Sequence, residues 1–444
     1  MNRFSYFGKG LLVIASLALV SCSKTGPKKG AYDDEGKERI AILSGATFLK
    51  ADKAIASLSI RLPKAYRNLN WAQPGGSASH AVHHLEVADT LSRVWKTSIG
   101  PGSTKYQRII SGPVAADGKV FAVDVHGSVS AIDLETGRRL WHKEIELEGE
   151  KSNVGYGGGV AYADGKVFAT SGFGITVALD ANSGSELWRY STNVPMRGAP
   201  TVADGRVFVL TQDNVQTALN AKTGELVWDQ VGITETAGML GAASPAYADG
   251  TIVYALSSGE LVAMRAENGR VLWQDSLTSS RRLTPLSTLA DVDGNPVIDR
   301  GKTYALSHAG SMVSIDMRSG ERSWEADVAG VNTPWIAGNF AYLATIDSQI
   351  ICISLSDGRL RWVAQLQRFQ DQEKRRGLVK WNGPVLAGDR LFVTSSHGYM
   401  LTISPYTGEV LSGIKIEGGS STPPAIVDGT LIVLSNNGDL IAYR

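Results

Sequence analysis

The chain is poor in cysteine: of its 444 residues only Cys22 and Cys352 are cysteines. No disulfide between them is expected, because Cys22 ends an export signal, and Cys352 in QIICISL is expected to be a small buried core residue. The chain also has almost no net charge, with 44 basic and 43 acidic residues, which excludes the electrostatic footprint of a nucleic-acid-binding protein. It shows no Cys-Cys pair, no nucleophile–base pair and no obvious set of calcium carboxylates. These absences favour a binding protein without cofactor or metal over an enzyme.

Long apolar runs are scarce too. The run at the N-terminus, Leu11–Val20, is too short to span a bilayer as a permanent helix. It follows Arg3 and Lys9 and precedes a small residue and Cys22, which is the order of an export signal over the first 21 residues. The segment that ends at Cys22 resembles the lipobox of bacterial lipoproteins. That resemblance implies that Cys22 is lipidated, and Ser23 after it implies sorting to the outer membrane.

One phrase is repeated along the rest of the chain: an Asp-Gly turn, an apolar run, a second turn, then Thr-Gly or a close variant and a Trp. Clear copies read ADGKVFAVDVHGSVSAIDLETGRRLW, ADGKVFATSGFGITVALDANSGSELW, ADGRVFVLTQDNVQTALNAKTGELVW and ADGTIVYALSSGELVAMRAENGRVLW. Weaker copies end at Trp324 and Trp362, and a seventh has Ser412 where the Trp is expected. A period of about 40 to 50 residues with several short strands in each unit indicates a propeller or a solenoid.

Each repeat is expected to form four antiparallel strands. In the first repeat they are Gly112–Ala116, Lys119–Asp124, Ser128–Asp133 and Arg138–Lys143. The second strands, such as KVFAVD and RVFVLT, are apolar on both faces, which fits a blade packed between two neighbours. The Trp that ends each repeat, called the blade tryptophan below, is expected to pack one blade on the next. The blade tryptophans are Trp95, Trp141, Trp188, Trp228, Trp273, Trp324 and Trp362.

The two ends of the chain complete each other. The C-terminal segment PPAIVDGTLIVLSNNGDLIAYR contains three strands and stops at Arg444, while LSRVWKTSIG supplies a fourth with Trp95. We therefore predict an all-β fold over residues 71–444: an eight-bladed β-propeller of four-stranded antiparallel blades, closed by pairing of the N- and C-terminal strands. A linear solenoid stays open but does not explain this match. Residues 22–70 carry no repeat and begin polar, so they are predicted to be a lipidated N-terminus and flexible tether.

The long connections between blades are expected on one rim of the ring, where binding sites are commonly built. One of them contains Val194, Met196 and Arg197, apolar residues next to an Arg, as in interface anchors. Another contains Asp291 and Asp293, which suit a basic partner surface. These five residues are the predicted partner-binding site. Insertion without a role is the alternative.

Other apparent motifs indicate no chemistry. The acidic loop lacks the Glu that an EF-hand needs at its twelfth position. His80, His83 and His84 lie in a polar stretch without other ligands nearby in the sequence and are expected to be solvated. The charged run Glu373–Arg376 is expected to be a solvated loop.

The Thr-Gly-x-x-x-Trp phrase over Leu91–Arg444 resembles the repeat of quinoprotein-type propellers. With the lipobox and the segment NLNWAQPGG, the chain is similar to the BamB family, lipoprotein subunits of the outer-membrane β-barrel assembly machinery. The resemblance implies a non-enzymatic scaffold, lipid-anchored at the periplasmic face of the outer membrane, that assists folding and insertion of β-barrel proteins. It implies binding to the POTRA domains of BamA and to other subunits of that complex; contact with nascent outer-membrane proteins stays open.

In that family the contacts come from an apolar–Arg loop and an acidic loop. Val194, Met196 and Arg197 match the first loop, with Val and Met where the family usually has Leu, and Asp291 and Asp293 match the second. Two other functions stay open. A pyrroloquinoline-quinone dehydrogenase shares the repeat but needs a calcium-bound cofactor and commonly a vicinal cysteine pair. A cell-wall or glycan-binding propeller is the third.

Overall fold

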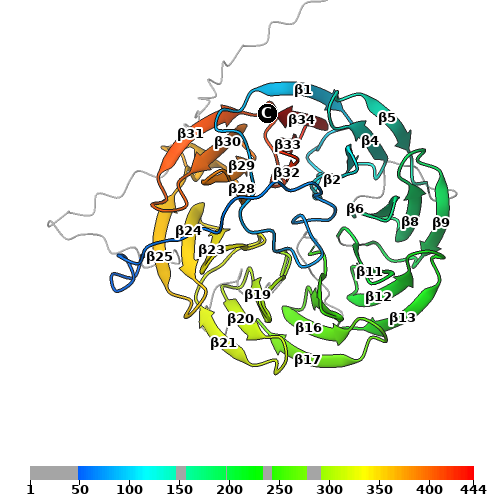
Figure 1. Ribbon diagram of the computed structural model, residues 1–444, viewed down its shortest axis with the longest axis horizontal. Helices are drawn as coiled ribbons and strands as arrows, with labels where there is room; N and C mark the ends of the chain where they lie inside the picture. The colour runs from blue at the N-terminus through cyan, green and yellow to red at the C-terminus, as the bar shows by residue number, and fades with distance from the viewer. Residues whose placement is uncertain (1–48, 147–156, 197, 234–242, 278–291) are drawn as a thin grey trace, which may run out of the picture. The chain divides into compact units, whose positions relative to one another are not determined.

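The computed structural model describes residues 49–146, 157–196, 198–233, 243–277 and 292–444. Across these ranges the chain forms β-strands joined by turns and loops, and no helix is long and apolar enough to cross a membrane. Eight four-stranded antiparallel sheets stand around a ring, with one further two-stranded hairpin (Figure 1). The predicted eight-bladed propeller is confirmed. Cys22 and the export signal lie outside the described residues.

Each sheet is one blade, and its strands follow one another from the centre of the ring to the circumference. Blades one to three consist of β2 (Val114–Ala116), β3 (Lys119–Val123), β4 (Val129–Asp133) and β5 (Arg139–Lys143); β6 (Val160–Ala163), β7 (Lys166–Thr170), β8 (Ile175–Asp180) and β9 (Glu186–Ser191); β10 (Thr201–Ala203), β11 (Arg206–Leu210), β12 (Val215–Asn220) and β13 (Leu226–Val231). Blades four to six consist of β14 (Ala246–Ala248), β15 (Thr251–Ala255), β16 (Glu260–Arg265) and β17 (Val271–Ser276); β18 (Val297–Asp299), β19 (Lys302–Leu306), β20 (Met312–Asp316) and β21 (Arg322–Ala326); β22 (Trp335–Ala337), β23 (Phe340–Ala344), β24 (Gln349–Ser354) and β25 (Leu360–Gln365). Blade seven consists of β28 (Trp381–Ala387), β29 (Arg390–Ser395), β30 (Tyr399–Ile403) and β31 (Val410–Lys415), and blade eight of β32 (Ala425–Val427), β33 (Thr430–Leu434), β34 (Asp439–Tyr443) and β1 (Arg93–Ser98).

Tight turns join the strands within a blade. Between β2 and β3, Asp117 has a φ of 50° and Gly118 a φ of 70°, as a two-residue hairpin turn requires. Every position of β3 after the first is buried, because the strand lies inside a blade that is packed between two others. The strands of blade one begin and end within two residues of the predicted ranges.

The blade tryptophans contact the next blade through one recurring arrangement. The Nε1–H of Trp95 donates to the carbonyl oxygen of Leu134 at 2.9 Å. A Cβ on Gly137, the glycine of the turn before β5, would lie 2.6 Å from the Trp95 ring, so this turn has room only for glycine. The pairs are Trp95–Gly137, Trp141–Gly184, Trp188–Gly224, Trp228–Gly269, Trp273–Gly320, Trp324–Gly358 and Trp362–Gly408.

The junction between blades seven and eight has no such pair, and the closure of the ring explains why. Blade eight has no turn glycine before its outer strand, because β34 ends the chain and β1 comes from the other end. A tryptophan at position 412 would have no glycine to pack on. Ser412 stands there and shares a hydrogen bond of 2.6 Å with Thr402.

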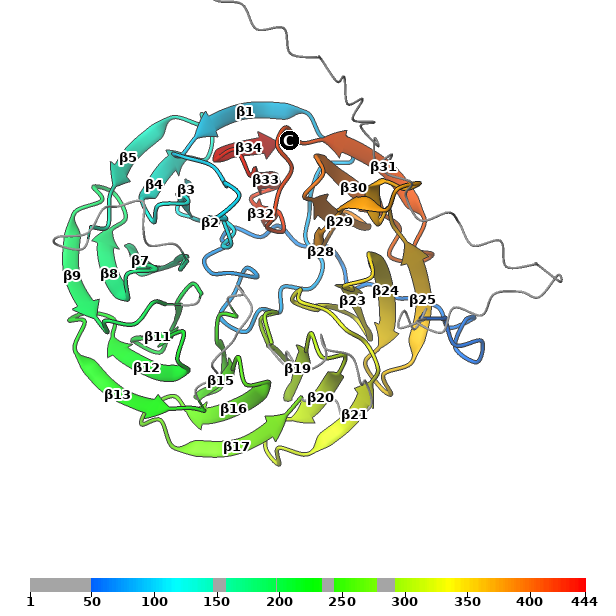
Figure 2. The ribbon, with the colours of Figure 1, turned by 180° about the vertical axis from the view of Figure 1, so that it is seen from behind.

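The ring closes as the sequence predicts. β1 pairs antiparallel with β34, with Trp95 opposite Ala442 and Ser98 opposite Asp439. Ser92 and Arg444 exchange backbone hydrogen bonds of 2.7 and 3.0 Å beyond the end of the ladder. The pairing of β1 with β34 thus completes blade eight and closes the ring (Figure 2).

Residues 68–88, called the inner segment below, contact the innermost part of every blade in turn and lie across the middle of the ring (Figures 1 and 2). Trp71, for example, exchanges two backbone hydrogen bonds with Ala115 of β2, of 2.7 and 2.8 Å. In chain order the contacts are Asn68 with Ile426 and Asp428 (blade eight), Trp71 with Ala115 (one), Ala72 with Tyr162 (two), Gln73 with Val202 (three), Ala78 with Tyr247 (four), Ser79 with Ile298 (five), His83 with Trp335 (six) and Leu85 with Leu386 (seven).

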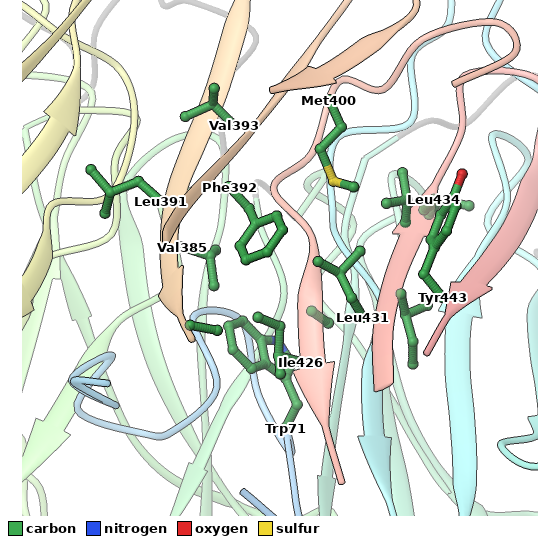
Figure 3. Close-up of a cluster of buried hydrophobic side chains, with 14 of the residues drawn as sticks. Trp71, Val385, Leu391, Phe392, Val393, Met400, Ile426, Leu431, Leu434 and Tyr443 are labelled. Atoms are coloured by element: carbon green, nitrogen blue, oxygen red, sulfur yellow. The ribbon is translucent and has the colours of Figure 1, made fainter. Parts of the chain in front are cut away.

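The side chain of Trp71 joins the inner segment to the largest hydrophobic cluster. It is 3 % exposed and stacks on Trp335, with ring centroids 6.1 Å apart. Figure 3 shows it beside Ile426 of blade eight and below Phe392 of blade seven. The inner segment therefore supplies core residues as well as backbone hydrogen bonds.

The described part of the predicted flexible tether, residues 49–70, also packs on the propeller. Ile55 is buried, the Asp52 N–H donates to the carbonyl oxygen of Leu360 at 2.8 Å, and Arg361 Nε donates to that of Leu58 at 2.9 Å. These contacts attach residues 52–58 to β25, at the circumference of blade six. Residues 22–48 of the predicted tether lie outside the described residues.

Two of the three histidines in the inner segment are buried, so the expectation that all are solvated is wrong. His80 Nδ1–H donates to Pro296 O and His84 Nδ1–H to Pro63 O, each at 2.7 Å. Burial lowers the pKa of His80 to about 4, so its imidazole is neutral at physiological pH. Cys352 is fully buried, as predicted, and burial raises the pKa of its thiol.

Candidate partner-binding rim

The connections between blades lie on one rim, together with the turns that join the second strand of each blade to the third. We call it the loop rim. The predicted apolar–Arg loop runs from β9 to β10 on this rim and rests on blade three: Gln212 N–H donates to Pro195 O at 2.8 Å. Thr192 Oγ1–H donates to Val194 O at 2.9 Å and fixes the turn that carries Val194.

The structure separates the predicted contact residues of this loop. Met196 is 2 % exposed and belongs to the hydrophobic cluster between blades two and three, with Trp188 and Val209. Its side chain therefore anchors the loop and is not on the surface. Val194 is half-buried and Pro195 is exposed, so they form the apolar surface of the loop. Arg197 lies outside the described residues.

The acidic loop follows β17, two blades further along the loop rim. Asp291 lies outside the described residues, and Asp293 is half-buried. Val292 between them is fully buried. The base of the loop packs closely on residues 332–333. Asn295 N–H donates to Thr333 Oγ1 at 3.1 Å, and a Cβ on Gly294 would lie 2.6 Å from Asn332 O. The described bases of both loops are thus held rigidly on the same rim.

The third long connection on this rim forms structure that the sequence did not predict. Its charged run, Glu373–Arg376, is exposed, as expected, but it belongs to the tip of a hairpin of β26 (Phe369–Asp371) and β27 (Arg376–Leu378). The left-handed residue at its tip is Arg375, with a φ of 51°. Arg368 at its base pairs with Asp347 at 3.0 Å.

On the described part of the chain, no three His, Cys, Asp or Glu side chains come together in a group that could hold a metal ion. The two buried histidines of the inner segment, His80 and His84, donate hydrogen bonds from Nδ1 to backbone carbonyl oxygens. On the described part of the loop rim, Val194 and Pro195 form an apolar surface and Asp293 is half-buried, each on a loop whose base is held by hydrogen bonds.

A family model described as "Outer membrane protein assembly factor BamB" matches residues 81–155 and 125–364. The BamB of Alkalilimnicola ehrlichii is 36 % identical over 372 residues, covering 83 % of this chain and 93 % of that protein. The BamB of Escherichia coli is 30 % identical over 358 residues, covering 80 % and 89 %.

Solved structures show the same fold. BamB from Moraxella catarrhalis superposes with a TM-score of 0.67 at 18 % identity, covering 80 % of this chain and all of that one. A quinohemoprotein alcohol dehydrogenase from Comamonas testosteroni gives a TM-score of 0.66 at 14 % identity, covering 85 % and 81 %, a likeness of fold alone. The family model and the relatives of 30 % identity or more decide the family. The chain belongs to the BamB family of outer membrane protein assembly factors.

Proposed function

We propose that this chain is a non-enzymatic scaffold of the outer-membrane β-barrel assembly complex, and that its loop rim binds the POTRA domains of BamA. The observation that carries the proposal is family membership over most of the chain, joined to two rigidly based loops on one rim. Val194 and Arg197 would form the apolar–cationic part of the contact, and Asp291 and Asp293 the acidic part. Met196 supports the first loop from the core.

Binding to purified POTRA domains tests the contact. We expect the double variant Arg197→Ala, Asp291→Ala to bind at least tenfold more weakly, because truncating charged anchor residues commonly costs more than about 1.4 kcal/mol each. The matched control is Arg318→Ala, Glu321→Ala, which removes the same kinds of charge from exposed positions of the turn before β21, on the opposite rim. Equal affinity of the wild type and the loop-rim variant would reject this contact.

We propose further that Cys22 is lipidated and holds the protein at the periplasmic face of the outer membrane. Its place after a short apolar run supports this. The test is fractionation: Cys22→Ser should move the protein from the outer-membrane fraction to the soluble periplasmic fraction, with loss of the acyl mass on the N-terminal peptide. A variant that stays in the membrane fraction without acyl mass would contradict the anchor.

A further inference from the structure

Blades two and three depart from a pattern that the other six blades share on the loop rim. Four residues after the blade-tryptophan position, those six blades have a buried aliphatic side chain. These residues are Ile99 0 %, Ile145 3 %, Leu277 0 %, Val328 1 %, Leu366 5 % and Ile416 1 % exposed. Blades two and three have Thr192 and Gly232 at the same position.

In blade three the apolar side chains stand on the surface. A Cβ on Gly232 would lie 2.8 Å from Gln216 Nε2 and 3.1 Å from Leu256 Cδ1, so buried neighbours already fill the space that an aliphatic side chain takes in the other blades. The residues on either side of this glycine are exposed instead: Val231 by 76 % and Ile233 by 58 %. Such exposure of neighbouring aliphatic side chains commonly marks a binding surface.

Both side chains are presented rigidly. Asn214, which is fully buried, donates from Nδ2 to Ile233 O at 2.7 Å, and its carbonyl oxygen accepts the Gly232 N–H at 3.0 Å. The same turn, Thr211–Asn214, holds the loop that carries Pro195. Val194, Pro195, Val231 and Ile233 therefore flank one turn, and we call them the blade-three apolar patch.

The patch lies at one end of β13, whose outer edge lacks the basic residues found at the other outer edges. β13 reads LVWDQV, with one charged residue, and lies on the circumference of the ring (Figure 1). Lys or Arg side chains at an edge ordinarily prevent another strand from pairing. The other outer strands contain Arg93 and Lys96, Arg139 and Lys143, Arg189, Arg322, Arg361 and Lys415, except β17.

The edge of β17 is occupied in another way: Arg322 of blade five bonds both Asp275 and the carbonyl oxygen of Ser276. At β25, Asp52 also occupies a carbonyl oxygen, that of Leu360. For β13, within the described ranges, no hydrogen bond from outside blade three reaches the strand's backbone. The edge of β13 therefore carries no basic side chain, and no hydrogen bond of the described residues outside blade three occupies it.

We propose that the outer edge of β13, together with the blade-three apolar patch, binds an extended polypeptide segment of alternating apolar residues as a fifth strand of the blade. Backbone hydrogen bonds would supply the ladder, and Val231 and Ile233 would contact the apolar side chains of the added strand. An apolar segment suits this strand because Asp229 is its only charged residue and Val231 is exposed. The chain already uses this mode of binding, since β1 completes blade eight on the free edge of β34.

The test uses the full chain and a labelled peptide that alternates Val with Thr, with Glu at both ends for solubility. We expect binding, measured by fluorescence anisotropy, to weaken by roughly tenfold or more in Val231→Lys, because a lysine at the edge opposes strand addition. The control is Leu411→Lys on β31, another exposed position on an outer strand (52 %), and it should bind as the wild type does. Val231 is exposed, so the substitution should leave thermal unfolding unchanged, which a melting curve checks.

A second peptide, N-methylated at alternate backbone positions, keeps the side chains and loses ladder donors. It should bind at least tenfold more weakly than the first if strand pairing is the mode. The proposal is overturned if the wild type does not bind the first peptide, if both peptides bind equally, or if the two lysine variants behave alike. These readouts use no POTRA domain, so they are separate from the test of the proposed partner contact.

Discussion

The indole of Trp228 lies directly against Gly269 of the next blade, where a Cβ would stand 2.8 Å from ring atom Cδ2. The same indole donates its N–H to Ala266 O at 2.9 Å. The tryptophan of one repeat and the turn glycine of the next are therefore two halves of one contact. This explains why both recur in the repeat, and why Ser412 replaces the tryptophan where the following turn is missing.

Gly269→Ala should destabilise the protein more than Gly250→Ala. Both glycines have left-handed φ, 71° and 76°, so both substitutions carry a backbone cost of about 1–2 kcal/mol. Only Gly269 faces an indole, whereas nothing lies within 4 Å of a Cβ at Gly250. Urea unfolding of the two variants separates the packing cost from the backbone cost. Equal losses would show that the indole moves aside freely.

Trp228→Ala should lower the free energy of unfolding by about 3–5 kcal/mol, because it opens a cavity between blades three and four and removes the hydrogen bond to Ala266. Val227→Ala on the same strand is the control. Its side chain is 42 % exposed, so the loss there should stay below about 1 kcal/mol. A Trp228→Ala loss no larger than that of the control would contradict a packing role for this residue.

Gln73→Ala tests the inner segment. The Gln73 amide donates to Val202 O at 2.6 Å and accepts from Val202 N–H at 3.0 Å, all in a buried setting. Removing it leaves two buried backbone groups unpaired, and we expect a loss of about 2–4 kcal/mol in the free energy of unfolding. Gln274→Ala, which removes an exposed amide bonded to Glu260, should cost much less. Comparable effects of the two changes would show that the Gln73 contact adds no stability.

Acid should destabilise the protein partly through His80. Its folded-state pKa is lowered to about 4, while the unfolded chain has the ordinary value of about 6.5. Between these values the unfolded state binds the proton more readily, so stability rises with pH across this window and falls on acidification. His80→Asn keeps a donor for Pro296 O and removes the titration. Its stability should fall by about 2 kcal/mol less than that of the wild type between about pH 7 and about pH 5.

Identical curves for the wild type and His80→Asn would show that His80 is solvated during the measurement.

The repeat and its closure could be predicted from sequence because their signals are local. Asp117 and Gly118 specify a tight turn by themselves, and LSRVWKTSIG carries its tryptophan in the same setting as the six other outer strands that have one. The path of residues 68–88 could not be predicted, because each residue pairs with a different blade through isolated hydrogen bonds. No strand or helix period results.

The candidate site, too, could be predicted from the sequence only in part. Composition marked the loop with Val194 and Met196, but it could not tell which side chain points inward, since both are apolar. Only the packing against Trp188 decides that Met196 is core. The sequence did contain a signal for the exposure of Val231 and Ile233, because Gly232 stands where six other repeats have an aliphatic residue. The sequence contained no signal for the hairpin around Arg375, because an exposed charged run is equally typical of an irregular loop.

Residues 68–88 bond to all eight blades, and this changes how the whole molecule should come apart. In an ordinary repeat array each unit touches only its neighbours, so units can melt from an end one after another. Here a single stretch joins units on opposite sides of the circle, from Ala115 to Ile298, and losing one unit strips partners from the stretch that serves all the others. We therefore expect unfolding to be all-or-none across more than three hundred residues, a length at which chains ordinarily divide into independent folding units.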